Sequence, residues 1–251
     1  MATLLLKLAG PLQSWGSESR FTERKTRHEP TKSGVVGLLA AALGRRRTDS
    51  IDDLAHLRFG VRIDQPGHYE RDYQTARTRS WNKDSRRWEP DKSLPLSRRY
   101  HLADAVFVVG LEGDVDLLES CAQALEHPVF PLFLGRRACP PSDRVLLSFE
   151  RSGSLDQTLH NAEWQASKWY QHKRKREQTI ELEMMLEKEA GAAVDAYSEE
   201  LRDVPLSFSQ VKRDYTWRTV VHGCTSVKNP LYRKTQEFEH DPWAALQGER
   251  G

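Results

Sequence analysis

The feature that most constrains the fold of this chain is the order in which its apolar segments follow one another. Thr3–Leu8 is an apolar run followed by a Gly-Pro pair, which is typical of a buried strand. A helix with an apolar side begins at Pro30-Thr31, and Gly44 is placed to end it. In Leu57–Ile63 apolar and polar residues alternate, which predicts a half-buried strand.

The segments that follow complete a recognisable order. Ala103–Gly110 predicts another buried strand, and Asp114 caps a helix that Pro128 ends. Val129–Leu134 predicts a fourth strand. Strand, helix, strand, strand, helix, strand is the order of the ferredoxin-like fold, which RNA-recognition modules also use. We therefore predict an α+β, ferredoxin-like (RRM-like) βαββαβ domain over residues 1–141.

A long connection interrupts this order. Residues 64–102 join the second and third strands, where the fold needs only a short hairpin. They hold nine cations, six acids and five aromatic residues, and so many rings argue against disorder. We predict a projecting β-hairpin with its tip near Asn82-Lys83-Asp84, which offers arginines to phosphates and rings to bases. The alternative is an arm that docks on a protein partner.

The pattern changes after Pro140-Pro141, and we place a domain boundary there. Residues 142–251 are predicted to form a small, mostly β domain with a charged helical insertion at about 161–200. The basic cluster Lys173–Arg176 within it is more typical of a solvated helix face than of an RNA contact. The strands predicted in this domain are Val145–Phe149, Leu206–Phe208 and Tyr215–Val221.

The charge is unevenly distributed along the chain. The formal net charge is +2, yet residues 1–100 hold 20 Lys and Arg against 12 Asp and Glu. Fifteen of these 20 cations are Arg, whose planar fork donates two parallel hydrogen bonds to a phosphate. The asymmetry predicts a nucleic-acid surface in the N-terminal part, and the alternative is an ordinary solvated surface.

Several protein classes are excluded on the sequence. No run of 18 apolar residues exists, so we expect no membrane span, and the N-terminus lacks the basic start of a signal peptide. Cys121, Cys139 and Cys224 lie far apart without a CxxC pair, which speaks against a disulfide framework and fits a reducing cytoplasm. The nine histidines form no HExxH motif, and we expect neither a metal nor another cofactor.

Two short motifs suit a bound anion. The segment Pro30–Gly34 contains a Lys-Ser pair but lacks the glycines of a P-loop, so nucleotide hydrolysis is rejected. Lys32 and Ser33 at a helix N-terminus suit an RNA phosphate, or else the residues here merely cap the helix. At Gly135-Arg136-Arg137 a glycine lets the backbone approach a ligand, and the arginines reach phosphates or stack on bases.

RNA contacts are predicted at basic, aromatic and loop residues, and RNA cleavage is considered at three others. Cleavage without a metal needs a general base and a general acid, for which His28, Tyr100 and His101 are the candidates. For Tyr100 and His101 the alternative is a strand-edge pair. The predicted RNA-binding residues are Trp15, Arg20, Arg24, Lys25, Arg27, Lys32, Ser33, Arg45, Arg46, Arg77, Arg79, Trp81, Arg86, Arg87, Gly135, Arg136 and Arg137.

Four segments carry a family resemblance. They read LLLKLAGPLQSWG, PTKSGVVGLLAAALG, RRYHLADAVFVVGLEG and PLFLGRRACPP. In this order they resemble the CasD subunits of type I-E CRISPR Cascade complexes, which belong to the repeat-associated mysterious proteins (RAMPs). The resemblance covers residues 1–141. It is looser over residues 142–251, where VPLSFSQVKRDYTWRTVV is similar to the closing strands of the family and residues 161–200 look like an insertion.

The resemblance implies a fold and a function. The fold is a ferredoxin-like RAMP domain with a thumb hairpin, matching residues 64–102, a glycine-rich loop, matching Leu134–Arg137, and a small C-terminal β-domain. Such subunits hold the 5′ handle of CRISPR RNA (crRNA), cap the backbone subunits beside the large subunit, and meet target DNA only through the complex.

Catalysis differs among the relatives. The resemblance implies a non-catalytic RNA-binding subunit of antiviral defence in the cytoplasm. The alternative is a metal-independent endoribonuclease that processes precursor crRNA, as type I-C relatives do.

Overall fold

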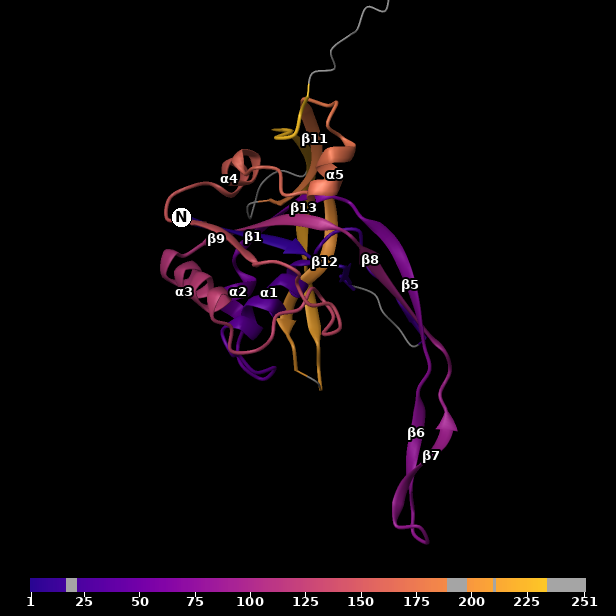
Figure 1. Cartoon of the computed structure of the whole chain (residues 1–251). Helices are drawn as coiled ribbons and strands as arrows, with labels where there is room; N and C mark the ends of the chain where they lie inside the picture. Colours follow the sequence, from indigo (N-terminus) through magenta and orange to yellow (C-terminus); the bar gives the residue numbers. More distant parts are fainter. Residues whose placement is uncertain (17–21, 189–197, 210, 234–251) are drawn as a thin grey trace, which may run out of the picture.

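The computed structural model of the chain describes residues 1–16, 22–188, 198–209 and 211–233. Its centre is a seven-stranded antiparallel sheet in the order β10-β1-β9-β4-β11-β13-β12 (Figure 1). The strands are β1 (Ala2–Ala9), β4 (Arg58–Gln65), β9 (Val106–Gly113), β10 (Leu146–Glu150), β11 (Thr179–Glu187), β12 (Ser198–Ser207) and β13 (Asp214–Lys228).

The N-terminal elements follow the predicted order. After β1 come α1 (Lys32–Ala42), the short α2 (Asp52–Ala55), then β4, β9 and α3 (Val115–Glu126). The predicted helix ends are confirmed, since Thr31 and Asp114 accept N-cap hydrogen bonds and Gly44 has a φ of +75° after α1. Helices α1 and α3 lie against one face of the sheet and bury the largest apolar cluster with β1, β4 and β9.

The predicted strand Val129–Leu134 is wrong. This segment is a loop in which Val129 and Phe130 are exposed and donate backbone hydrogen bonds to the last carbonyls of α1. Pro131 in the middle of the run has no N–H to give to a strand ladder. The place beside β1 is taken by β10, which corresponds to the strand predicted at Val145–Phe149.

The helix predicted at about 161–200 is also largely wrong. Only two short helices lie near it, α4 (Leu155–Asn161) and α5 (Lys168–Lys173), and residues 189–197 lie outside the described part. Residues 179–187 form β11, in which Ile180, Leu182 and Met184 are buried and the glutamates between them are exposed. The period of two, hidden among many charges, marks a strand.

The two ends of the described chain meet in one sheet. β10 pairs with β1 at one side, while β11 pairs with β4 and carries β13 and β12 at the other. The strands predicted at Leu206–Phe208 and Tyr215–Val221 belong to the longer β12 and β13, with Phe208 just past the end of β12. Strands on both sides of residue 141 share this sheet, so the sheet itself shows no boundary there. The separate domain over residues 142–251 stays a prediction.

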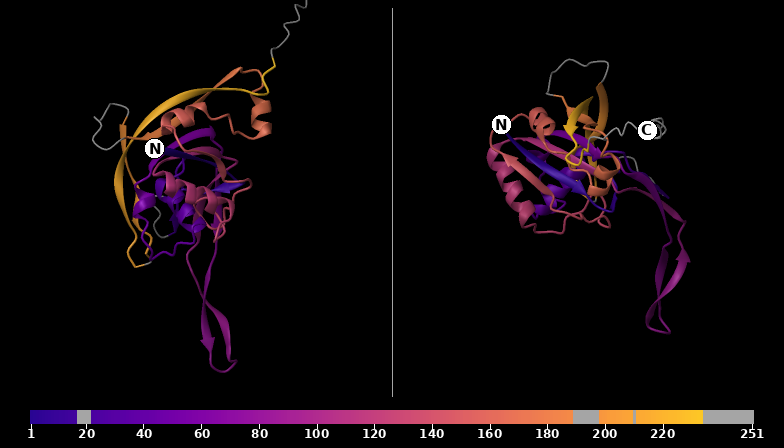
Figure 2. Two further views of the ribbon diagram at one scale, coloured as in Figure 1. Left: turned by 90° about the vertical axis from the view of Figure 1, so that its left-hand side faces the viewer. Right: turned by 45° about the horizontal axis from the view of Figure 1, so that its top comes forward.

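Residues 68–103, here called the arm, leave the body between β4 and β9 as a long hairpin (Figures 1 and 2). β5 pairs with β8 near the body and β6 with β7 near the tip, where residues 83–86 form the turn. The short β2 and β3 flank β8 at the base of the arm. The bounds are β5 (His68–Gln74), β6 (Arg77–Asn82), β7 (Arg87–Ser93), β8 (Ser97–Ala103), β2 (Leu12–Gln13) and β3 (Glu23–Arg24).

None of the helices in the described ranges combines the length and the apolar character needed to cross a membrane.

Candidate nucleic-acid interface

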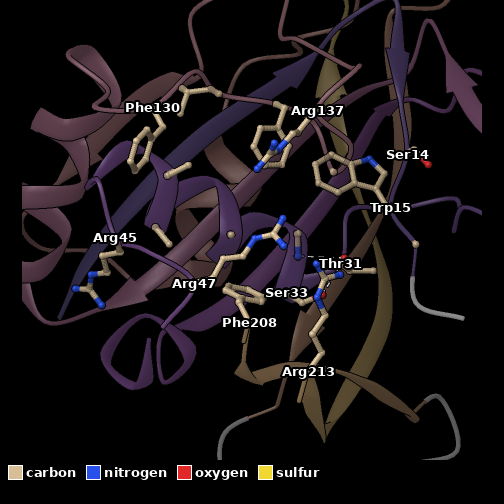
Figure 3. Close-up of a pocket in the computed structure, with 18 of the residues that line it drawn as sticks. Ser14, Trp15, Thr31, Ser33, Arg45, Arg47, Phe130, Arg137, Phe208 and Arg213 are labelled. Atoms are coloured by element: carbon tan, nitrogen blue, oxygen red, sulfur yellow. Dashed lines mark hydrogen bonds between the residues drawn. The ribbon is translucent and has the colours of Figure 1, made fainter. Parts of the chain in front are cut away.

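A basic cavity of about 860 Å³ lies between α1, the loop of residues 130–137 and the turn that joins β12 to β13 (Figure 3). Five arginines and five aromatic residues line it, and neither Asp nor Glu is among its described lining residues. Such a cavity offers donors to phosphates and rings to bases. The lining arginines are Arg45, Arg46, Arg47, Arg137 and Arg213, and the rings are those of Trp15, Phe130, Phe133, Phe208 and Tyr215.

Three of the arginines turn their charge into the cavity. Arg47, Arg137 and Arg213 are exposed, and none forms an ion pair within the described part of the chain. Figure 3 shows Arg47 and Arg213 reaching toward Ser33, with Arg137 coming from the loop on the other side. Unpaired guanidinium groups that converge from three separate elements form a ready site for a bent chain of phosphates.

Arg45, in contrast, is used by the protein itself. Its two terminal nitrogens lie 2.5 Å from the two carboxylate oxygens of Asp53, and one of them also donates to the carbonyl of Ser50. The hydrogen bond with Asp53 raises the pKa of Arg45. In Figure 3 its side chain points away from Arg47 and Arg213. Arg46 is exposed at the rim of the cavity.

Trp15 forms a wall of the cavity and is fully buried. Its Nε1 donates to Oε1 of Gln13 at 3.1 Å, and its backbone N–H donates to Oγ1 of Thr26 at 2.8 Å. A Cβ on Gly34 would lie 2.8 Å from the indole ring. The structure therefore contradicts the prediction that Trp15 contacts RNA, because its ring has no exposed surface on which a base could stack.

The structure contradicts the prediction that Lys32 contacts RNA. Its side chain is 3% exposed, and its Nζ lies 2.9 Å from both carboxylate oxygens of Glu187. Burial lowers the pKa of Lys32. Its backbone N–H, at the start of α1, donates to Asp203. The anion at this helix end is the protein's own carboxylate, whereas Ser33 does line the cavity.

The Gly135-Arg136-Arg137 motif divides into three roles. Gly135 has a φ of +80°, and a Cβ there would lie 1.9 Å from the carbonyl oxygen of Ser14, so the protein's own backbone requires the glycine. Arg136 donates to the carbonyls of Tyr100 and Arg24, which ties the loop to the base of the arm. Burial lowers the pKa of Arg136. Only Arg137 offers a cation to the cavity.

The other predicted RNA residues lie elsewhere. Arg24 and Lys25 are exposed at the base of the arm, and Arg20 lies outside the described residues. Arg27 pairs with Glu29 at 2.5 Å, so its charge is neutralised. Trp81 packs edge-on against Trp88 near the tip, with the ring centroids 5.8 Å apart. The exposed residues of the arm among those predicted are Arg77, Arg79, Trp81, Arg86 and Arg87.

The three candidate residues for RNA cleavage do not all lie on one face of the arm. His101 is 6% exposed, and its Nδ1 lies 3.6 Å from Sγ of Cys139. Tyr100 precedes it in β8, so the two side chains point to opposite faces of the strand. His28 is exposed and packs against Tyr69. In residues 1–16, 22–188, 198–209 and 211–233, no group of three or more His, Cys, Asp or Glu could hold a metal ion.

Several lining residues escaped sequence reasoning. Arg47 follows two predicted arginines and could have been included with them on the same grounds. Arg213 lies between two predicted strands and Phe208 ends the first of them, and nothing in the sequence indicates that either residue faces α1. Phe130 was assigned to a strand, although the residue is 44% exposed and lines the cavity.

Comparisons with known proteins agree with one another. The family model described as CRISPR-associated protein (Cas_Cas5) matches residues 3–221. The Cascade subunit CasD of Escherichia coli (strain K12) is 31% identical over 172 residues, which cover 64% of this chain and 76% of CasD.

Two solved structures are similar over nearly their whole length. A chain of a CRISPR RNA-guided surveillance complex matches with a TM-score of 0.72 and 29% identity, over 98% of this chain and 99% of its own. A crystal structure of a Cas protein matches with a TM-score of 0.65 and 36% identity, over 92% of this chain and 98% of its own. The chain therefore belongs to the Cas5 family of CRISPR-associated proteins and is a homologue of CasD.

Proposed function

We propose that this protein is the non-catalytic subunit of a type I-E Cascade complex that holds the 5′ handle of crRNA. The observation that carries the proposal is the basic cavity, in which three arginines without a carboxylate partner face Ser33 and α1. Single-stranded RNA is recognised by cations that follow its backbone and by rings that stack on its bases. The cavity offers both kinds of group.

The fold fits the RAMP interpretation. We interpret β1, α1, β4, β9, α3 and β10 as the ferredoxin-like unit, because β10-β1-β9-β4 is the order that this fold gives its four strands. We draw the end of this unit after β10 rather than at residue 141, since β10 supplies the fourth strand. Strands β11 to β13 then form the smaller C-terminal part.

We assign the arm the role of the thumb. Its exposed arginines and the pair of Trp81 and Trp88 stand apart from the cavity, so RNA leaving the cavity meets a second cationic surface. Exposed tryptophans are typical of a surface that is covered in an assembly. The backbone subunits and the large subunit of Cascade are the proposed neighbours, and target DNA is reached through them.

The proposal includes no RNA cleavage by this subunit, which we place in the cytoplasm. His101 is buried and Tyr100 points to the other face of β8, so these two residues do not act as a general acid and base on one phosphate. Incubation of the purified protein with precursor repeat RNA in EDTA should leave the RNA intact. Site-specific cleavage would favour the endoribonuclease alternative.

RNA binding tests the role of the cavity. We expect the triple variant R47A/R137A/R213A to lose most of its affinity for a synthetic RNA that copies the repeat-derived 5′ end. The slope of log K against log salt should become shallower by about 2, at about 0.7 per phosphate contact. The control R144A/R151A/R202A removes the same charge from exposed surface ion pairs outside the cavity. An equal loss of RNA affinity in both variants would show that the cavity arginines act only through non-specific electrostatic attraction.

A further inference from the structure

Gly37, in the middle of α1, has no structural reason to be a glycine. A glycine inside a helix is less stable than an alanine because its backbone loses more freedom. A Cβ on Gly37 would meet the ring of Phe208 at 3.7 Å, which is ordinary van der Waals contact. Among the described residues, nothing approaches closely enough to exclude a side chain there.

Gly34, one turn earlier on the same helix, differs in this respect. A Cβ on Gly34 would lie 2.8 Å from the Trp15 ring and 3.0 Å from Oγ1 of Thr31. The protein's own packing therefore requires Gly34. Both glycines line the cavity, and at Gly37 the open space on the helix is space within the cavity itself.

The surroundings of Gly37 are apolar at the helix and cationic at the edge. Gly37, Ala40 and Ala41 form a floor of small residues on α1. Phe208 lies beside Gly37, and Phe130 lies beside Ala41, to whose carbonyl its backbone N–H donates at 3.2 Å. The guanidinium groups at the edge are those of Arg47, Arg137 and Arg213 (Figure 3).

We propose that Gly37, Ala40 and Ala41 form a base site, in which one unpaired nucleobase of the bound RNA lies flat on α1. The bases of single-stranded RNA bind apolar and aromatic surfaces, while their phosphates bind cations. The base site requires the base to point inward and its phosphates to lie outward on Arg47 and Arg213. The inference rests on the proposed function and adds the orientation of the RNA and a residue that determines it.

The test adds side-chain volume to the base site and leaves the charges of the cavity unchanged. Gly37→Ala and Gly37→Leu place side chains of increasing size on the base site, and both residues form helices better than glycine. Gly223→Leu is the matched control, because a Cβ on Gly223 would meet nothing within 4 Å and that residue lies on β13 outside the cavity. Thermal melts of the full-length variants are recorded beside their affinities for the synthetic RNA that copies the repeat-derived 5′ end.

We expect Gly37→Leu to melt no lower than the wild type and to bind this RNA at least tenfold more weakly, with a smaller loss for Gly37→Ala and none for Gly223→Leu. A series of RNAs with one abasic position each locates the base. Wild type and Gly37→Leu should bind with equal affinity only the RNA whose abasic position is that of the base in the base site.

Two results would overturn the base site. One is wild-type RNA affinity in Gly37→Leu, and the other is a Gly37→Leu variant that binds every abasic RNA more weakly than the wild type by the same factor. If Gly37→Leu fails to fold, Gly37→Ala decides by the same abasic series. Wild-type affinity in Gly37→Leu together with the expected loss in R47A/R137A/R213A overturns the base site alone. A wild-type protein that binds the RNA no better than a scrambled RNA overturns the proposed function and the base site together.

Discussion

The carboxylate of Asp203 accepts a hydrogen bond from the backbone N–H of Lys32 at 2.8 Å, across 171 positions of sequence. The same carboxylate takes two hydrogen bonds from the guanidinium group of Arg218, at 2.6 and 3.0 Å. One buried side chain on β12 thus joins the start of α1 to β13. Both partners belong to elements that border the cavity, so Asp203 connects two of its walls.

The first prediction concerns this connection. Asp203→Ala leaves the buried Arg218 without its carboxylate, and loss of one partner of a buried pair costs about 3–5 kcal/mol. Asp203→Asn keeps an acceptor for Lys32 and should lose less. The free energy of unfolding from urea titration measures both. A loss below about 1 kcal/mol in Asp203→Ala would show that the pair stabilises no more than a surface ion pair does.

The second prediction is a dependence of stability on pH through His101. Burial lowers the pKa of His101 in the folded protein, and Arg136 lowers it further. Below about pH 6.5 the unfolded chain therefore binds a proton that the folded protein refuses, and stability falls as the pH falls toward the folded pKa. The slope from this group approaches about 1.4 kcal/mol per pH unit at most.

His101→Gln should reduce the fall of the unfolding free energy at acid pH. Urea titrations at several pH values between about 7.5 and 5 measure this free energy. His28→Gln is the control, since His28 is exposed. An identical acid slope in wild type and His101→Gln would assign the loss of stability to other groups.

The third prediction is that Gly135 matters for folding. Gly135→Val forces a β-branched residue to a φ of +80° and places its Cβ against the Ser14 carbonyl. A strained backbone conformation of this kind costs on the order of 1–3 kcal/mol, and the clash adds to it. Differential scanning calorimetry should show a lowered Tm. A melt like that of the wild type would mean that the loop can move away from Ser14 without loss.

The fourth prediction is that the arm serves assembly and not folding. A two-residue Gly-Ser turn that replaces residues 75–96 would join Gln74 to Ser97, which already face each other across β5 and β8. The residues removed are almost all exposed, so a cooperative melt near the wild-type Tm is expected. The shortened protein should fail to enter a stable particle with crRNA and the backbone subunits, as size-exclusion chromatography would show. Normal assembly would contradict the thumb role.

Sequence reasoning succeeded where the signal was local. The cap residues Thr31 and Asp114 and the glycine after α1 were placed correctly because each acts on the backbone next to it. β11 was missed because glutamates fill its exposed face, and their number suggested a charged helix. Val129–Leu134 has the composition of a strand, but tertiary contacts use it to end α1 and to line the cavity.

The candidate site was foreseen in part for the same reason. Ser33, Arg46 and Arg137 were predicted, and they line the cavity. Lys32 was predicted on the same grounds but is buried. The prediction failed because its partner Glu187 comes from β11, a strand that the sequence did not reveal. Arg213 lies between β12 and β13, which join the sheet through β11, and no short motif reveals that this places it at the same cavity as α1.

The unbroken sheet has a mechanical consequence. β4 is hydrogen-bonded to β9 on one side and to β11 on the other, so one continuous sheet connects the part of the fold that carries α1 with β12 and β13. A rigid receptor of this kind holds its shape before the ligand arrives, and the more flexible molecule must adapt. Under the proposed function, the bound RNA would adopt the bend that the cavity imposes, and every copy of the complex would hold its RNA in the same conformation at this site.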